Sequence, residues 1–312
     1  MRSLLLAALV SLFAGCASGQ ATAVAPGVPT LDRAGLLEDV RVLSADSMAG
    51  RRTGTPGGVK ARAYVAAAFA RAGLKPFEGG YARGFSFATG RDSTRVEGAN
   101  LVGYLEGSER GDRFIVVSAH YDHLGVQNGQ VFNGADDNAS GTAALVAIAE
   151  YFAAHRPRHS MIFAAMDAEE AGLRGAQAFV AAPPVAREAT VLDVNLDMVS
   201  HSERGELYAA GAHHYPALRP YLERLAARAP VKLLLGHDAP TLPPGDDWTS
   251  SSDHGAFHAV GIPFVYFGVE DHADYHRPTD DFETITPEFF VHAAETVAAF
   301  IADVDRGLDP IR

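Results

Sequence analysis

Residues 114–123 read FIVVSAHYDH, a mostly apolar run that ends in a cluster of imidazole and carboxylate side chains. The run over 114–119 is typical of a strand buried in a parallel sheet. Ligands of α/β sheets bind beyond the carboxyl ends of the strands, so His120 and Asp122 fall where such a fold places its site. Similar apolar runs predict further buried strands over 100–105, 161–165, 191–196 and 262–267.

Helical segments separate several of these strands. Stretches rich in Ala and other apolar residues, such as the one that ends at Gly73 with Pro76 beyond it, predict helices. The predicted helices cover 31–46, 57–73, 139–154 and 287–304. Strands that alternate with helices predict an α/β fold, with a mixed, largely parallel β-sheet flanked by helices on both faces. No repeat or second long linker interrupts the pattern, so we expect one domain over 31–306 and a short C-terminal tail over 307–312.

Composition excludes several classes of protein. The 312 residues include 26 Lys and Arg against 38 Asp and Glu, which gives a formal net charge of −12. A net-acidic chain without a basic block has no electrostatic footprint for nucleic acid. Its single cysteine, Cys16, excludes an intramolecular disulfide and a cysteine-based zinc finger.

The N-terminal sequence predicts export. Residues 1–16 read MRSLLLAALVSLFAGC, a signal peptide in length and charge, and they end in a segment that resembles a bacterial lipobox. We expect cleavage before Cys16, a lipid anchor on it, and a flexible tether over 17–30. With Ala17 next, the resemblance implies an outer-membrane lipoprotein that faces the periplasm or the cell surface. The alternative is a plain secretory signal and a soluble periplasmic protein.

Carboxylates and imidazoles gather just after the predicted strands and before the helix at 139–154. Taken singly, each has an ordinary explanation, because Asx residues cap helices and acidic loops are solvated. Asp197 is harder to dismiss, since an Asp within the apolar VNLDMV is costly unless it is paired or metal-bound. Their shared position predicts a common site. The segments are 120–123, 136–138, 169–170, 197 and 271–276.

Charge indicates what would hold this site together. Carboxylates that converge on one edge of a sheet repel one another, and the chain offers no basic cluster there to neutralise them. A pair of divalent cations does so directly. With imidazole and carboxylate ligands and no thiolate, Zn²⁺ or a similar borderline ion is indicated.

At these residues the chain resembles the M28 family of zinc metallopeptidases, the dinuclear aminopeptidase group. Six stretches carry the resemblance, in the family's order and over about half of the chain that follows the signal. They are AHYDHLG (119–125), NGADDNASGTAAL (133–145), DAEEAGLRGA (167–176), NLDMV (195–199), SSDHGAFHAVGIPFV (251–265) and DYHRPTDD (274–281).

The resemblance implies a role for each matching residue. Glu169 would be the general base, Asp122 would orient the ring of His120, and the peptide bond between Asp137 and Asn138 would be cis. Tyr275 is a candidate to steady the oxyanion, Asp136 to support the loop, and Asp253 and His254 receive no ligand role. Two Zn²⁺ ions would be held, with Asp137 bridging them, by His120, Asp137, Glu170, Asp197 and His276.

The implied reaction is hydrolysis of N-terminal peptide bonds by a water that bridges the two ions, with Glu169 as its base. Peptides with a free N-terminus would be the substrates. Two alternatives remain open: a glutaminyl-cyclase-like acyltransferase with one zinc, and a non-catalytic peptidase-like binding domain. A serine or cysteine nucleophile is not indicated, because no G-x-S-x-G occurs and Cys16 lies in the signal. Residues 237–250 are either a lid or a plain surface loop.

Overall fold

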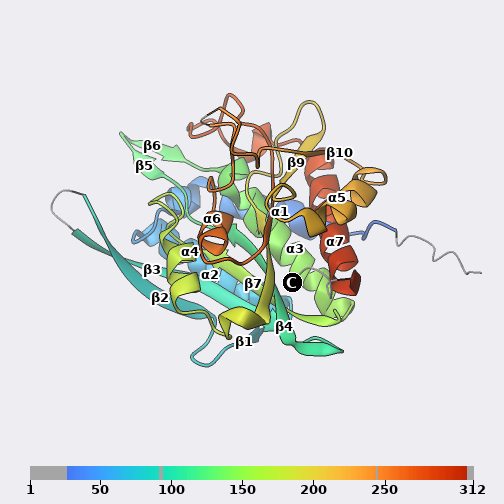
Figure 1. Cartoon of the computed structure of the whole chain (residues 1–312). Helices are drawn as coiled ribbons and strands as arrows, with labels where there is room; N and C mark the ends of the chain where they lie inside the picture. The colour runs from blue at the N-terminus through green and yellow to red at the C-terminus, as the bar shows by residue number, and fades with distance from the viewer. Residues whose placement is uncertain (1–26, 91–93, 244, 308–312) are drawn as a thin grey trace, which may run out of the picture.

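The computed structural model describes residues 27–90, 94–243 and 245–307 (Figure 1). Within them one large sheet carries helices on both faces, which confirms the predicted α/β fold. The predicted signal peptide and lipobox over 1–16, with Cys16, lie outside the described residues. So do residues 17–26 of the tether and 308–312 of the tail, and these assignments stay predictions. None of the described helices is both long and apolar enough to cross a membrane.

The sheet has nine strands among the described residues. In chain order they are β1 (Lys75–Pro76), β2 (Ala82–Thr89), β3 (Thr94–Leu105), β4 (Arg110–His120), β7 (His159–Met166), β8 (Thr190–Leu196), β9 (Glu206–Ala210), β10 (Lys232–Leu235) and β11 (Phe264–Gly268). A separate hairpin consists of β5 (Gly125–Gln127) and β6 (Gln130–Phe132). The five predicted strands correspond to β3, β4, β7, β8 and β11.

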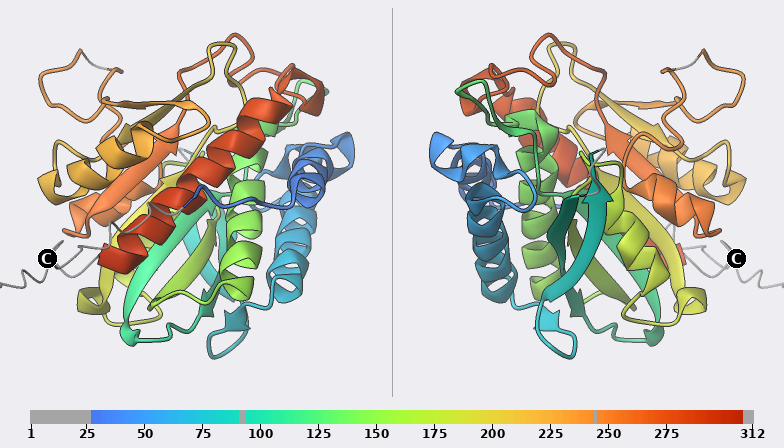
Figure 2. Two further views of the ribbon diagram at one scale, coloured as in Figure 1. Left: turned by 90° about the vertical axis from the view of Figure 1, so that its right-hand side faces the viewer. Right: turned by 90° about the vertical axis from the view of Figure 1, so that its left-hand side faces the viewer.

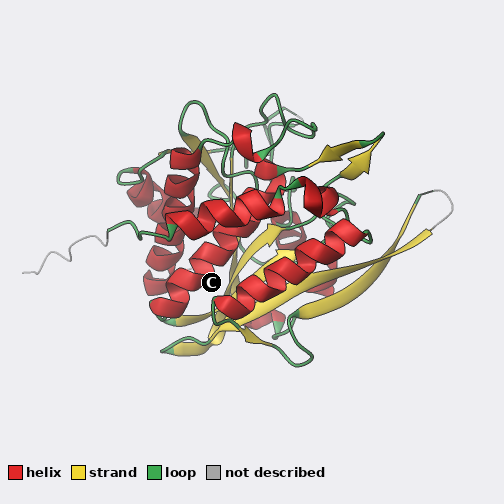
Figure 3. Ribbon diagram, turned by 180° about the vertical axis from the view of Figure 1, so that it is seen from behind, coloured by secondary structure: helices red, strands yellow, loops and turns green. Residues whose placement is uncertain are grey.

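Four parallel strands form the centre of the sheet, in the order β7-β4-β8-β11. On one side, β3 pairs antiparallel with β7 and carries β1 and β2, so that the β2–β3 hairpin extends away from the body (Figures 1 and 3). On the other side, β9 pairs antiparallel with β11, and β10 continues parallel to β9. The sheet is therefore mixed, with a parallel centre.

The helices cover the two faces unequally (Figure 2). They are α1 (Arg33–Leu43), α2 (Pro56–Arg71), α3 (Gly141–Ala154), α4 (Arg174–Ala181), α5 (Arg219–Ala226), α6 (His254–Ala259) and α7 (Pro287–Gly307). One face packs against α1, α2, α3, α5 and α7, and the other against α4 and α6. The predicted helices correspond to α1, α2, α3 and α7. The last runs three residues further than expected.

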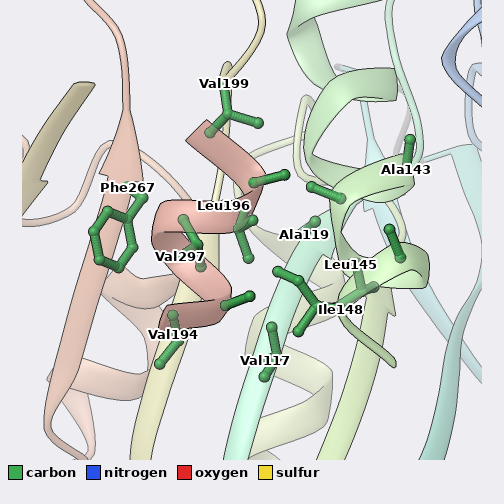
Figure 4. Close-up of a cluster of buried hydrophobic side chains, with 14 of the residues drawn as sticks. Val117, Ala119, Ala143, Leu145, Ile148, Val194, Leu196, Val199, Phe267 and Val297 are labelled. Atoms are coloured by element: carbon green, nitrogen blue, oxygen red, sulfur yellow. The ribbon is translucent and has the colours of Figure 1, made fainter. Parts of the chain in front are cut away.

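Strand alternation divides the core between these faces. Ile115, Val117 and Ala119 of β4 pack in the larger cluster under α3 and α7, and Figure 4 shows Val117 and Ala119 there. Val116 packs instead in the smaller cluster under α4 and α6. Because side chains alternate along a strand, His120 points to the same face as Val116. A large apolar side chain buried in this way contributes about 1.5–3 kcal/mol. The parallel centre is thus anchored from both faces.

A buried arginine joins three segments around the carboxyl ends of these strands. Arg51 closes the short 3₁₀ turn over Asp46–Arg51 and is fully buried. Its guanidinium donates to the backbone oxygens of Leu43, Tyr121, Asn133 and Gly134. The end of α1, the segment after β4 and the loop before α3 are thereby held by one side chain.

Replacement of Arg51 by Met should therefore lower the free energy of unfolding by about 3 kcal/mol, because buried carbonyl oxygens lose their donors. Urea unfolding of the purified protein measures this. Arg41→Met is the matched control, because Arg41 is exposed and pairs with Glu38 one turn away. Equal midpoints for the two variants would show that the buried guanidinium does not hold the segments together.

Candidate metal centre

The ends of β4 and β8 place His120 and Asp197 side by side. From β4 the chain continues in the sheet to β7 on one side, and from β8 it continues to β9, which lies beyond β11 on the other side. The connections thus diverge between these two neighbouring strands, which is where α/β sheets bind their ligands. His120 Nε2 lies 3.1 Å from Asp197 Oδ1, and both residues are buried. This is the start of the site that the sequence predicts.

Asp137 reaches the same point from the turn before α3. The turn spans Ala135–Ser140 and is kinked at Asp137 and Asn138, whose backbone angles are not helical; the peptide bond between them is cis, as the resemblance implies. Asp137 Oδ1 lies 3.4 Å from His120 Nε2. Gly134 begins the turn at a φ of 56°, and a Cβ there would lie 2.5 Å from the ring of His123. Only glycine lets the turn pack this closely.

The adjacent glutamates after β7 point to different partners. Glu169 lies with its carboxylate 4.0 Å from His120 Nε2, and its backbone N–H donates to Asp122 Oδ1 at 3.1 Å. Glu170 Oε1 lies 2.7 Å from His123 Nδ1. Glu169 thus lies on the His120 side of the site, and Glu170 lies on the His123 side.

His276 closes the site from the loop after β11. Its Nε2 lies 3.1 Å from Asp137 Oδ2 and 3.4 Å from Glu170 Oε2, and its side chain is 39% exposed. The structure therefore brings together every residue predicted as a metal ligand or base. Those residues are His120, Asp137, Glu169, Glu170, Asp197 and His276.

His123 is a member of this site that sequence reasoning did not single out. It is fully buried, and its Nδ1 also lies 3.6 Å from Asp137 Oδ2. Its ring centroid is 6.0 Å from that of His276, so both imidazoles face the same two carboxylates. The signal was present in AHYDHLG, where a second imidazole follows the first by three residues.

Asp122 contacts the His120 ring through its backbone oxygen, not through its carboxylate as expected. His120 Nδ1 contacts the backbone oxygen of Asp122 at 3.2 Å, whereas the nearer carboxylate oxygen lies 3.7 Å away. The carboxylate instead accepts from the backbone of Glu169 and, at 3.4 Å, from the hydroxyl of Thr53. Asp122 thus links the imidazole after β4 to the glutamate after β7.

The donor atoms fit divalent ions. His120, Asp137 and Asp197 form one group whose donor atoms lie within 4.8 Å of one another; His123, Asp137 and Glu170 form a second, and Asp137 belongs to both. His123 Nδ1 and Glu170 Oε1 approach closely, yet neither has a hydrogen-bond partner among the described residues. His123 Nδ1 and Glu170 Oε1 are therefore placed as two ligands of one metal ion would be. Imidazole and carboxylate donors suit zinc.

The electrostatics of the site also favour added positive charge. Burial alone would lower the pKa of His120, but the carboxylates of Asp197 and Glu169 raise it well above its ordinary value. Burial would raise the pKa of Asp137, but the surrounding imidazoles hold it well below its ordinary range. The carboxylates thus favour positive charge at His120, and bound cations would supply positive charge at the same point.

A pocket of about 630 Å³ opens onto the donor atoms. Trp248 and Asp246 of the 237–250 loop line it, so this loop borders the site. The base of the loop is closed by a hydrogen bond from the Trp248 N–H to the His237 oxygen, 2.6 Å long, and by stacking of the two rings. Beyond the metal-type donors, the wall carries the carboxylates of Asp246, Glu270 and Asp271. Neither Lys nor Arg is among the described residues that line it.

Known proteins are similar to this chain in sequence and in fold. The sequence profile described as "Peptidase family M28" matches residues 100–301, and the chain belongs to this family. Aminopeptidase YwaD of Bacillus subtilis (strain 168) is 30% identical over 196 residues, which cover 60% of this chain and 40% of that protein. The chain spans less than half of the length of the curated relatives it matches.

Solved structures show the same fold at low identity. The structure of BSAP, a zinc aminopeptidase from Bacillus subtilis, matches with a TM-score of 0.68 at 18% identity over 89% of this chain and 96% of that one. A glutaminyl cyclase from Porphyromonas gingivalis matches with a TM-score of 0.71 at 18% identity, over 88% and 98%. At these identities the likeness concerns the fold alone.

The double variant His120→Ala/His276→Ala should lose tightly bound zinc, because each half of the site loses an imidazole donor. Metal analysis by mass spectrometry after gel filtration measures it. The control His155→Ala/His213→Ala removes two exposed imidazoles outside the site and should keep the wild-type zinc content. Wild-type zinc in the first variant, with a normal circular dichroism spectrum, would contradict the predicted ligands.

Proposed function

We propose that the protein is an aminopeptidase that holds two zinc ions and hydrolyses the first peptide bond of peptides with a free N-terminus. The observation that carries this proposal is the charge of the pocket. Its described lining includes carboxylates beyond the metal-type donors and neither Lys nor Arg. Such a wall attracts an N-terminal ammonium and repels a C-terminal carboxylate, which favours an aminopeptidase over a carboxypeptidase.

The proposed ligands divide between the two ions. His120 and Asp197 would hold one ion, Glu170 and His276 the other, and Asp137 would bridge them; His123 faces the second pair as a further donor. When bound, the ions supply positive charge that polarises the scissile carbonyl and lowers the pKa of a water molecule. The chain's own part is to keep these donors in place through the strand ends that carry them.

Glu169 is the proposed general base. Burial raises the pKa of its carboxyl well above its ordinary value, and bound cations would lower that pKa. A carboxylate tuned in this way takes a proton from the attacking water and returns it to the leaving amine. The hydrogen bond from its backbone N–H to Asp122 positions it beside His120.

Two tyrosines line the same pocket and stay protonated. Burial, reinforced by the surrounding carboxylates, raises the pKa of Tyr275 and of Tyr266 above the ordinary value. The Tyr266 hydroxyl is used structurally, since it donates to the backbone oxygen of Asp197 at 3.1 Å. Tyr275, stacked on His276 at 3.9 Å between ring centroids, remains the candidate donor to the substrate oxygen.

Glu169→Gln should lower kcat by about 10²–10⁴-fold, because the amide takes no proton, while zinc content stays unchanged. Hydrolysis of aminoacyl-anilides by the zinc-loaded protein measures kcat. Glu78→Gln, an exposed glutamate in the β1–β2 turn, is the matched control and should keep wild-type kcat. Full activity in Glu169→Gln would reject this residue as the base.

Acetylation of the substrate N-terminus should abolish turnover, because the acidic pocket loses the ammonium it attracts. A panel of free, N-acetylated and N-terminally glutaminyl peptides, analysed by mass spectrometry, tests this with and without chelator. Turnover of acetylated peptides at the rate of free ones would contradict the aminopeptidase. Cyclisation of the glutaminyl peptides with release of ammonia, without peptide cleavage, would identify the cyclase reaction instead.

A further inference from the structure

A third group of metal-type donors lies outside the centre described above. It consists of His201, which follows β8, and of His272 and Asp274, which follow β11. One donor atom from each lies within 4.8 Å of the other two, and all three residues are half-buried. The group shares no residue with the predicted dinuclear site.

His201 has an unused donor. Its Nδ1 is buried and finds no hydrogen-bond partner among the described residues. Its ring stacks on that of His272, with centroids 3.9 Å apart and planes 12° from parallel. A buried ring nitrogen without a partner is costly, and a metal ligand bond is one way to satisfy it.

His272 has a carboxylate partner on one ring nitrogen, as metal-binding histidines commonly do. Its Nε2 lies 3.1 Å from Asp136 Oδ2, and Asp136 is itself fixed because its Oδ1 accepts from the N–H and the hydroxyl of Ser200, at 2.7 and 2.8 Å. When Nε2 donates to this carboxylate, Nδ1 keeps its lone pair. At present Nδ1 accepts only a long hydrogen bond of 3.3 Å from the Asp274 N–H.

The surroundings leave room and charge for an ion. Thr279 donates to Asp274 Oδ1 at 2.6 Å, which leaves Oδ2 for another contact. The group borders an open pocket of about 630 Å³, in which water can complete a coordination sphere. Arg204 also lines this pocket, but it pairs with Glu206 at 3.7 Å. Carboxylates outnumber this one cation: the lining includes Glu203, Glu206, Glu270, Asp271 and Asp274.

We propose that His201, His272 and Asp274 bind a further divalent cation of the borderline class, such as Zn²⁺ or Cu²⁺. Two imidazoles and one carboxylate favour such ions over Mg²⁺ or Ca²⁺. Ligands of a tetrahedral zinc lie about 3.3 Å apart. Ion binding therefore requires the donor atoms to approach and the two stacked rings to turn out of their parallel arrangement, because the lone pair of a ring nitrogen lies in the ring plane. This site goes beyond the proposed peptidase activity and does not depend on it.

The ion would join two segments that carry predicted ligands of the dinuclear site. Asp197 lies four residues before His201, and His276 lies four residues after His272. A bond from each segment to one ion would restrain both, so the further site would be structural. Its occupancy is expected to raise the melting temperature of protein whose dinuclear site is already loaded.

Zinc binding to the chelator-treated full chain tests the proposal. The wild type should bind one more zinc per chain than His201→Ala or Asp274→Asn, as counted by mass spectrometry after equilibrium dialysis. His155→Ala is the matched control and should bind as the wild type does. Because ions are counted rather than turnover, the outcome is separate from that of the peptidase assays.

Copper gives an independent spectroscopic reading. Cu²⁺ added to wild type that carries only two zinc ions per chain should show nitrogen couplings in electron paramagnetic resonance, and these should be lost in His201→Ala. A melting temperature that rises with excess zinc in the wild type, but not in this variant, would support the same site. Equal zinc counts in the wild type and both site variants, or an unchanged copper spectrum in His201→Ala, would overturn the proposal.

Discussion

Repulsion between buried carboxylates is the constraint around which this end of the sheet is built. Asp137 lies within a few ångströms of both Asp197 and Glu170, where low dielectric strengthens every charge interaction. Three imidazoles interleave with them, and the fixed parallel register of β7, β4 and β8 holds both kinds of group in place. Without positive charge at this point, burial of so many acids would oppose folding.

The same strands also bury polar groups that need no cation. Below His120 and Asp197, on the face covered by α6, Ser118 donates to Asp193 at 2.9 Å, and Asn195 donates to Ser118 at 3.1 Å. Burial raises the pKa of Asp193 well above its ordinary value, which favours the neutral acid. This acid, deep in the sheet, thus contacts a hydroxyl of the neighbouring strand and needs no cation.

The central strands were predictable because both of their faces are buried, which makes the sequence uniformly apolar. The strand β2, the first part of β3 over 94–99, β9 and β10 escaped prediction because they are short or half-exposed and mix polar with apolar residues. The predicted site residues come together because each follows a buried strand or starts the adjoining turn. Arg51 could not be foreseen, since its partners are backbone oxygens, which leave no pattern in the sequence. His123 was visible in the motif, but only the fold shows that its ring faces Asp137.

Asp122 sets the spacing between His120 and Glu169, because its backbone oxygen contacts the imidazole and its carboxylate accepts from the Glu169 N–H. Since His120 is also paired in register with Met166 at the end of β7, that spacing is inherited from the sheet rather than from the longer loops. Segments further out, such as the β5–β6 hairpin, can therefore diverge in length or composition while the reactive geometry is preserved. A scaffold of this kind lends itself to the evolution of new substrate ranges by loop exchange alone.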